Sequence, residues 1–271
     1  MLKALLVLAV ASAVGLAAVF KMEIAKSPID NTTKYRFRMK ESSLFNRKGS
    51  QQIITDDFYL ANITIGTPGQ NFTVALVTGR SDLWVVDAAC ETESCLGNFP
   101  FQGFHRNTFD TRMSTTFKNE SRDFDIWFGS SSGRVYGNVG SDVVTIAGLQ
   151  IESQGLGVVN DLRKNVAKLH FDGILGLAWP SHSDIDTNPP VFNLLPQLDE
   201  PIFTVWLDRH MKPSEGVVGG LITYGGTDKE HCDAQLTYAP VFFDFKENWD
   251  NENGTWRIEV SSLITAGIDV L

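Results

Sequence analysis

Short apolar runs of strand length divide this sequence, and they constrain its fold more than any other feature. The runs alternate β-branched or aromatic residues with polar ones, and clusters of Gly, Pro, Asn and Asp separate them at hairpin spacings. Helical periodicity is confined to residues 160–171 and 191–198, and Pro196 interrupts the second stretch. The pattern predicts an all-β fold of antiparallel sheets with few short helices. The runs are FYLANITIG (58–66), NFTVALV (71–77), DFDIWFG (123–129), DVVTIAG (142–148), PIFTVWLD (201–208) and WRIEVSSLI (256–264).

The first residues read as a leader to the secretory pathway. Residues 1–18 carry one Lys, an apolar run and then small residues, which is typical of a cleavable signal peptide and less so of a signal anchor. The following basic segment, residues 19–50, precedes an acidic body in a chain of net charge −9. This asymmetry suggests either an electrostatic latch or a solvated arm, and the acidic body argues against a nucleic-acid partner.

Sequons and cysteines agree with a secreted or endolysosomal destination. Cys90 and Cys95 could close a short disulfide loop in an oxidising compartment, the alternative being two unpaired thiols. Cys232 is left over, either without its partner or as a free thiol. The asparagines of Asn-x-Ser/Thr glycosylation sequons are Asn31, Asn62, Asn71, Asn119 and Asn253.

Several motifs together point to a family. FYLANITIGTPGQNFTVALVTGRSDLWV (58–85) delivers Thr78-Gly79 after a strand, an Ile-Gly-Thr-Pro turn and a second strand. FDGILGLAWPS (171–181) and the CETESC loop follow at the expected places. From about residue 56 to its end the chain resembles the pepsin-like aspartic peptidases. The resemblance implies a pepsin-like first lobe, a disulfide between Cys90 and Cys95, and a structural role for Asp172 in the strand that crosses behind the catalytic loop.

The resemblance also implies a chemistry, which this sequence does not match. In the family each lobe presents one Asp on a tight Asp-Thr/Ser-Gly turn, and the two carboxyls share a proton, activate water and protonate the peptide carbonyl. Here Val77 stands at the first Asp position, and Arg80 stands where Ser is usual. An arginine there needs either solvent or an acid such as Asp82. We therefore expect the turn formed by Val77, Thr78, Gly79 and Arg80 to be degenerate.

The second turn and the flap also differ from the family pattern. No Asp-Thr-Gly or Asp-Ser-Gly occurs in the sequence, so the second catalytic Asp is expected to be absent. The family's flap tyrosine, which bonds toward a tryptophan, corresponds here to Phe128, followed by Gly129, with Trp84 as the tryptophan. We expect a flap over an apolar cleft that lacks its polar contact. The expected organisation is a signal peptide (1–18), a propeptide-like segment (19–50), a pepsin-like N-terminal lobe (51–226) and a truncated start of the C-terminal lobe (227–271).

Three functions are compatible with these residues. The first is a pseudo-peptidase of the secretory pathway that binds a peptide or protein in its cleft without cutting it. The second is an active aspartic endopeptidase represented by an incomplete sequence, and the third is a non-catalytic structural or interaction protein. No cofactor or metal site is expected, because the five His residues are scattered and no phosphate-binding glycine loop occurs. After removal of the signal peptide no membrane span is expected, and two copies could associate through the uncovered face of the lobe.

Overall fold

In the computed structural model, one large mixed sheet organises the chain. The structure describes residues 19–26, 59–97, 104–128, 133–164, 166–208, 218–233, 235–241, 254–260, 264–265 and 268–269. Ten strands lie in the order β5-β6-β7-β4-β8-β3-β2-β1-β10-β9, and the separate strands β11 (Ile264–Thr265) and β12 (Ile268–Asp269) pair with each other. The ten strands are β1 (Phe20–Lys26), β2 (Tyr59–Ile65), β3 (Gln70–Val77), β4 (Leu83–Val86), β5 (Lys118–Phe128), β6 (Gly133–Ile146), β7 (Leu149–Lys164), β8 (Gly173–Gly176), β9 (Phe203–Leu207) and β10 (Val218–Tyr224).

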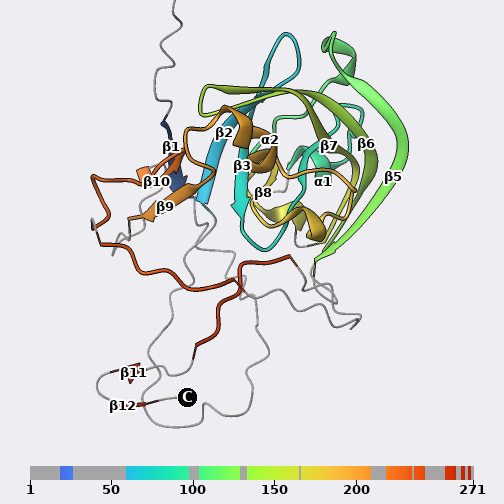
Figure 1. Cartoon of the computed structure of the whole chain (residues 1–271). Helices are drawn as coiled ribbons and strands as arrows, with labels where there is room; N and C mark the ends of the chain where they lie inside the picture. Colours follow the sequence, from blue (N-terminus) through green and yellow to red (C-terminus); the bar gives the residue numbers. More distant parts are fainter. Residues whose placement is uncertain are drawn as a thin grey trace, which may run out of the picture.

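The sheet closes on itself around the main core. An additional pairing joins β2 to β6, so β6, β7, β4, β8, β3 and β2 form a closed ring of strands. Figure 1 shows the long strands β6 and β7 of this ring curving together with β5, which lies outside them. Most pairs are antiparallel, as the sequence predicts, whereas β3 with β8 and β4 with β7 are parallel. The prediction of an all-β fold is confirmed, and the parallel pairs are an addition that single-strand patterns do not reveal.

Turn chemistry fixes the longest hairpin. β6 and β7 are joined by Ala147 and Gly148 alone, and both residues have positive φ, at 53° and 82°. A two-residue turn with this backbone matches the twist of antiparallel strands, and Gly148 adopts it without steric cost.

Helices are few and short. They comprise α1 (Glu93–Leu96), α2 (Pro190–Leu194) and the 3-10 turns η1 (Thr111–Met113), η2 (Val166–Lys168), η3 (Pro180–His182) and η4 (Leu195–Gln197). The helix expected at 191–198 corresponds to α2 and η4. The helix expected at 160–171 is wrong, because β7 continues to Lys164 and its end pairs with β6, for example Leu162 with Val135. Within the described residues no helix is long and apolar enough to cross a membrane.

Strand β1 comes from the segment that was expected to be propeptide-like. It lies between β10 and β2, pairing antiparallel with both. Met22 and Ile24 are buried in the main core, and Lys21 on the opposite face reaches Glu230 at 3.3 Å. The predicted signal peptide at 1–18 and most of the predicted propeptide-like segment lie outside the described residues.

We expect Ile24→Ala to lower the free energy of unfolding by about 2–4 kcal/mol, because Ile24 is almost fully buried and packs over Gly220. Lys21→Ala on the same strand should cost under ~1 kcal/mol, because its ion pair is exposed. Urea unfolding of the full chain measures both values. Equal, small effects would show that β1 is not part of the cooperative core.

Candidate functional site

The turn that follows β3 is fixed by backbone hydrogen bonds from the residues that follow β8. Leu177 donates its backbone N–H to the carbonyl oxygen of Val77 at 2.9 Å, and Ala178 does the same to Arg80 at 2.9 Å. Gly176 pairs with Val77, and a Cβ on Gly176 would collide with the backbone of Ser81. Glycine is therefore required there for the close approach that positions the 77–80 turn.

Three of the predicted site residues come together in one hydrophobic cluster. Trp84 is fully buried there, with Phe171 edge-on at 6.3 Å between ring centroids, and Val77 and Phe128 pack against the same cluster. Thr78 and Gly79 are exposed. Gly129, the remaining predicted flap residue, lies outside the described part of the chain. At the position expected for a carboxyl, the turn thus carries an isopropyl group that contributes to packing.

Arg80 finds an acid, but a different one from the acid considered from the sequence. Its Nη1 donates to Asp184 Oδ2 at 2.8 Å, and its Nη2 donates to the carbonyl oxygen of Trp127 at 2.8 Å. Its guanidinium also lies 5.0 Å from the ring centroid of Phe128. Arg80 therefore connects the turn to the end of β5, the first strand of the predicted flap hairpin, and to the loop after η3.

Asp82, the acid considered from the sequence, accepts hydrogen bonds from the loop after η3. It is buried, with Ser183 Oγ donating to its Oδ1 at 2.6 Å and the Asp184 amide donating to its Oδ2 at 2.9 Å. Burial raises the pKa of Asp82, while the bonds from Ser183 and Asp184 oppose that rise. Asp82 thus fixes the loop that carries Asp184, and so positions the acid that pairs with Arg80.

A polar pocket opens beside the turn. Its volume is about 660 Å³, within the size range of ligand-binding sites in proteins. Gly79 and Arg80 line it from the turn, and a Cβ on Gly79 would meet no atom within 4 Å. The other lining residues are Asp125, Trp127, His182, Asp184, Thr255 and Arg257. Sequence reasoning did not assign these residues to the site, because they lie far from the turn in sequence. Asp125 and Trp127 belong to the run 123–129, which was interpreted only as a strand and the start of the flap.

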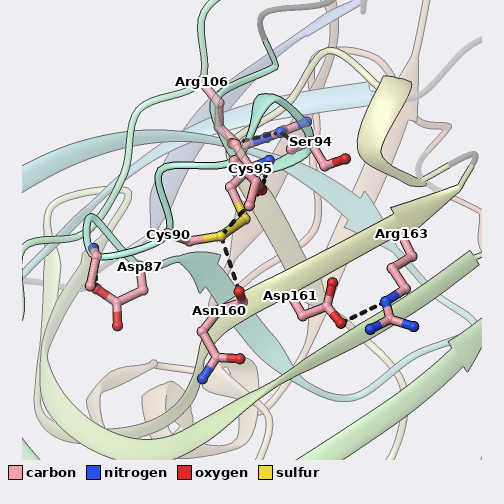
Figure 2. The surroundings of a disulfide bond; sticks show 10 residues. Asp87, Cys90, Ser94, Cys95, Arg106, Asn160, Asp161 and Arg163 are labelled. Atoms are coloured by element: carbon pink, nitrogen blue, oxygen red, sulfur yellow. Dashed lines mark hydrogen bonds and ion pairs between the residues drawn. A yellow bond between two sulfur atoms is a disulfide. The ribbon is translucent and has the colours of Figure 1, made fainter.

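The predicted disulfide is present, and both of its cysteines are buried (Figure 2). Cys90 and Cys95 are bonded around α1, whose N-cap Thr92 accepts the Cys95 amide at 3.3 Å. Arg106, which no sequence signal identified, is buried and donates to five backbone carbonyls. These belong to Ser94, Cys95, Ala167, Leu169 and Phe171.

A buried aspartate accompanies this arginine. Burial lowers the pKa of Arg106 to about 10, and the nearby carboxylate of Asp172 opposes that change. Asp172 accepts backbone N–H groups from Thr73 at 2.7 Å and Asn107 at 2.8 Å. These contacts agree with the structural role expected for Asp172.

The remaining predicted residues are placed as follows. The sequon residues Asn62, Asn71 and Asn119 are exposed, whereas Asn31 and Asn253 lie outside the described residues. Cys232 is a free thiol of intermediate exposure. In the described part of the chain, one cluster after β10 has metal-ligand spacing, made of Asp228, Glu230 and His231. Its groups are already engaged, since His231 Nδ1 lies 2.6 Å from Asp228 Oδ2 and Glu230 pairs with Lys21.

Comparison with known proteins supports the resemblance seen in the sequence. The sequence model of the family described as eukaryotic aspartyl protease matches residues 58–270. The chain is similar to Aspartic protease 1 of Caenorhabditis elegans, with 49% identity over 69% of this chain and 47% of the relative. It is also similar to Aspartic protease 17 of the same organism, at 43% with the same coverage. Cathepsin E-A of Xenopus laevis is 30% identical over 76% of this chain and 47% of its own length. The chain thus spans about half the length of these relatives.

We expect Arg80→Ala to lower the free energy of unfolding by about 1–2 kcal/mol, because Arg80 and Asp184 are both largely shielded and the arginine makes two charge-assisted bonds. Arg112→Ala is the matched control. Its side chain is 84% exposed although it also pairs with an aspartate, so its loss should change the free energy of unfolding much less than the loss of Arg80. Chemical denaturation measures both, and equal effects would contradict a structural role for Arg80.

Asp82 predicts a pH dependence. Its pKa in the folded state is raised above the ordinary value of 3.8, so the folded protein holds this proton more tightly. The resulting stability is fully present below pH 3.8 and is lost as the pH rises through the raised pKa. The free energy of unfolding of wild type minus that of Asp82→Asn should therefore decrease from about pH 3 to about pH 7, because only the wild type has an ionisable group at this position. Urea unfolding across this range, with exposed Asp199→Asn as control, tests the sign, and a difference that grows with pH would contradict it.

Proposed function

Because the chain belongs to the eukaryotic aspartyl protease family, we propose that it binds peptides beside a degenerate first-lobe turn and does not hydrolyse them. The observation that carries this proposal is the presence of Val77 at the end of β3. Arg80, three residues after Val77, is paired with Asp184. The family chemistry needs a carboxyl that takes a proton from water, and an isopropyl group cannot do so. Arg80 brings a positive charge to the position where the family uses an uncharged hydroxyl.

The surroundings of the turn support binding. The pocket combines an exposed aromatic side chain, Trp127, with acidic and basic side chains and with the open position at Gly79. Aromatic surface and a few fixed polar groups are the usual composition of a site for a peptide or other polar organic ligand. We propose an extended peptide as the ligand, because the pocket lies between the turn and the end of β5.

A route through the secretory pathway is part of the same proposal. The Cys90–Cys95 disulfide favours an oxidising compartment, and the three described sequons are exposed and accessible to glycosylation. Relatives include proteins named cathepsin E, gastricsin and vacuolar protease A. We propose secretion or endolysosomal delivery, with residues 1–18 as the leader.

The alternative function is proteolysis by a longer form of the chain. It is favoured by the 49% identity to a protein named as an aspartic protease and by coverage of about half of that protein. The intact mass of the native protein distinguishes the two, since the alternative requires a species that extends beyond Leu271.

The proposal predicts retention without cleavage. Immobilised full chain should retain peptides from a casein digest at acid pH and return them at unchanged mass, with no pepstatin-sensitive shortening. Gly79→Phe should lower retention by about tenfold, because the added ring enters the pocket without displacing any neighbour. Gly79→Ala, the matched control, should leave retention nearly unchanged.

Each part can fail separately. Robust pepstatin-sensitive cleavage by the wild-type chain would overturn the non-hydrolytic function. Equal retention by wild type and Gly79→Phe would show that peptides bind elsewhere.

A further inference from the structure

Two of the exposed sequons lie opposite each other on neighbouring strands. Asn62 and Thr64 belong to β2, Asn71 and Thr73 belong to β3, and these antiparallel strands lie side by side (Figure 1). In the observed register Asn62 pairs with Thr73, and Thr64 pairs with Asn71. The asparagine of each sequon therefore faces the threonine of the other sequon.

Both sequons lie on the outer face of this hairpin. Ile63 and Phe72 pair with each other between them and are only 2% exposed each, whereas Asn62 and Asn71 are exposed. Successive residues of a strand point to opposite faces of the sheet. The burial of the middle pair therefore places both asparagines on the solvent side.

A hydrogen bond joins the two sequons. Thr73 Oγ1 donates to Asn62 Oδ1 at 3.0 Å. An N-linked sugar is attached to the amide nitrogen of asparagine, whereas this bond uses the amide oxygen, so the bond is compatible with the modification. It orients the Asn62 amide, and with it the first sugar of a glycan attached there.

The spacing of the two asparagines brings their glycans together. Asn62 and Asn71 are diagonal neighbours across the ladder, and such positions lie about 7–8 Å apart in antiparallel sheets. N-linked glycans are bulky compared with this separation. Two glycans at these positions would therefore cover each other's attachment points.

We propose that Asn62 and Asn71 both carry N-linked glycans, which lie side by side over β2 and β3 and shield each other. The proposal rests on the proposed route through the secretory pathway and not on what the pocket binds. The attachment points lie away from the pocket, because Asn71 and Val77 stand near opposite ends of β3, about 20 Å apart in an extended strand.

The donor in this modification is an oligosaccharide linked to a lipid diphosphate in the secretory pathway. The asparagine amide nitrogen bonds to the anomeric carbon of the oligosaccharide, and the bond from that carbon to the diphosphate oxygen breaks. The lipid diphosphate leaves with the electron pair of that bond, and the amide nitrogen loses one proton.

Enzymatic deglycosylation of the native protein tests the shielding. The full chain is expressed through the secretory pathway of a eukaryotic host, and glycopeptide mass spectrometry follows each sequon. Wild type should carry glycans at Asn62, Asn71 and Asn119. An amidase that cleaves the bond between glycan and asparagine should remove the Asn71 glycan several-fold faster from Asn62→Gln than from wild type, because the neighbouring glycan is gone. Asn71→Gln should have the same effect on the Asn62 glycan.

Two controls separate the effect of the glycan from that of the side chain that carries it. Thr64→Val removes the sequon of Asn62 but leaves this asparagine in place, so it should accelerate removal of the Asn71 glycan as much as Asn62→Gln does. Asn119→Gln removes a glycan from β5, at the edge of the sheet beyond β6. It should leave the removal rates at Asn62 and Asn71 unchanged.

The outcomes distinguish this proposal from the route on which it rests. A chain modified at Asn119 but at one or neither of Asn62 and Asn71 would overturn the paired glycans, while the secretory route stands. Removal rates that are the same in wild type, Asn62→Gln and Asn71→Gln would overturn the mutual shielding. A chain without any glycan would overturn both the pair and the route.

Discussion

The passage of β8 between β3 and β4 is the constraint on which the candidate site depends. β8 pairs parallel with β3 and antiparallel with β4, the two strands that flank the 77–80 turn. This close packing requires glycine, because a Cβ on Gly173 would collide with the backbone of Trp84 and one on Gly176 with that of Ser81. The backbone of the turn is thus held by main-chain bonds that do not involve the side chain at position 77. A valine can therefore occupy this position while the turn keeps its place.

The charged side chains Arg80, Asp82 and Asp184 at the turn are paired with one another or with nearby donors. Arg80 forms an ion pair with Asp184. Asp82 is buried nearby and accepts a hydrogen bond from Ser183 Oγ. Arg80 and Asp82 therefore each have specific partners of their own. The arrangement is a stable packing solution, and it differs from a site that keeps two acids close together to share a proton.

The sequence predicted local features well and distant pairings poorly. The strands and the turn after β3 depend on nearby residues, so the sequence pattern indicated them. The spacing of Cys90 and Cys95 allowed a disulfide, and the resemblance to the family implied it. The pair of Arg80 with Asp184 joins residues 104 positions apart, and no motif connects them. The error at 160–171 has a similar origin, because pairing of the end of β7 with β6 overrode a weak helical periodicity. The core position of β1 was also missed, since charge was the feature that drew attention to residues 19–50.

Arg106 shows how much of the lobe one buried charge can connect. Its guanidinium reaches carbonyls in the disulfide loop, in and after η2, and at the entry to β8. None of these segments can move away without leaving a buried donor unsatisfied. We therefore expect the disulfide loop, η2 and the entry to β8 to open together, as one cooperative unit, when the native state unfolds locally.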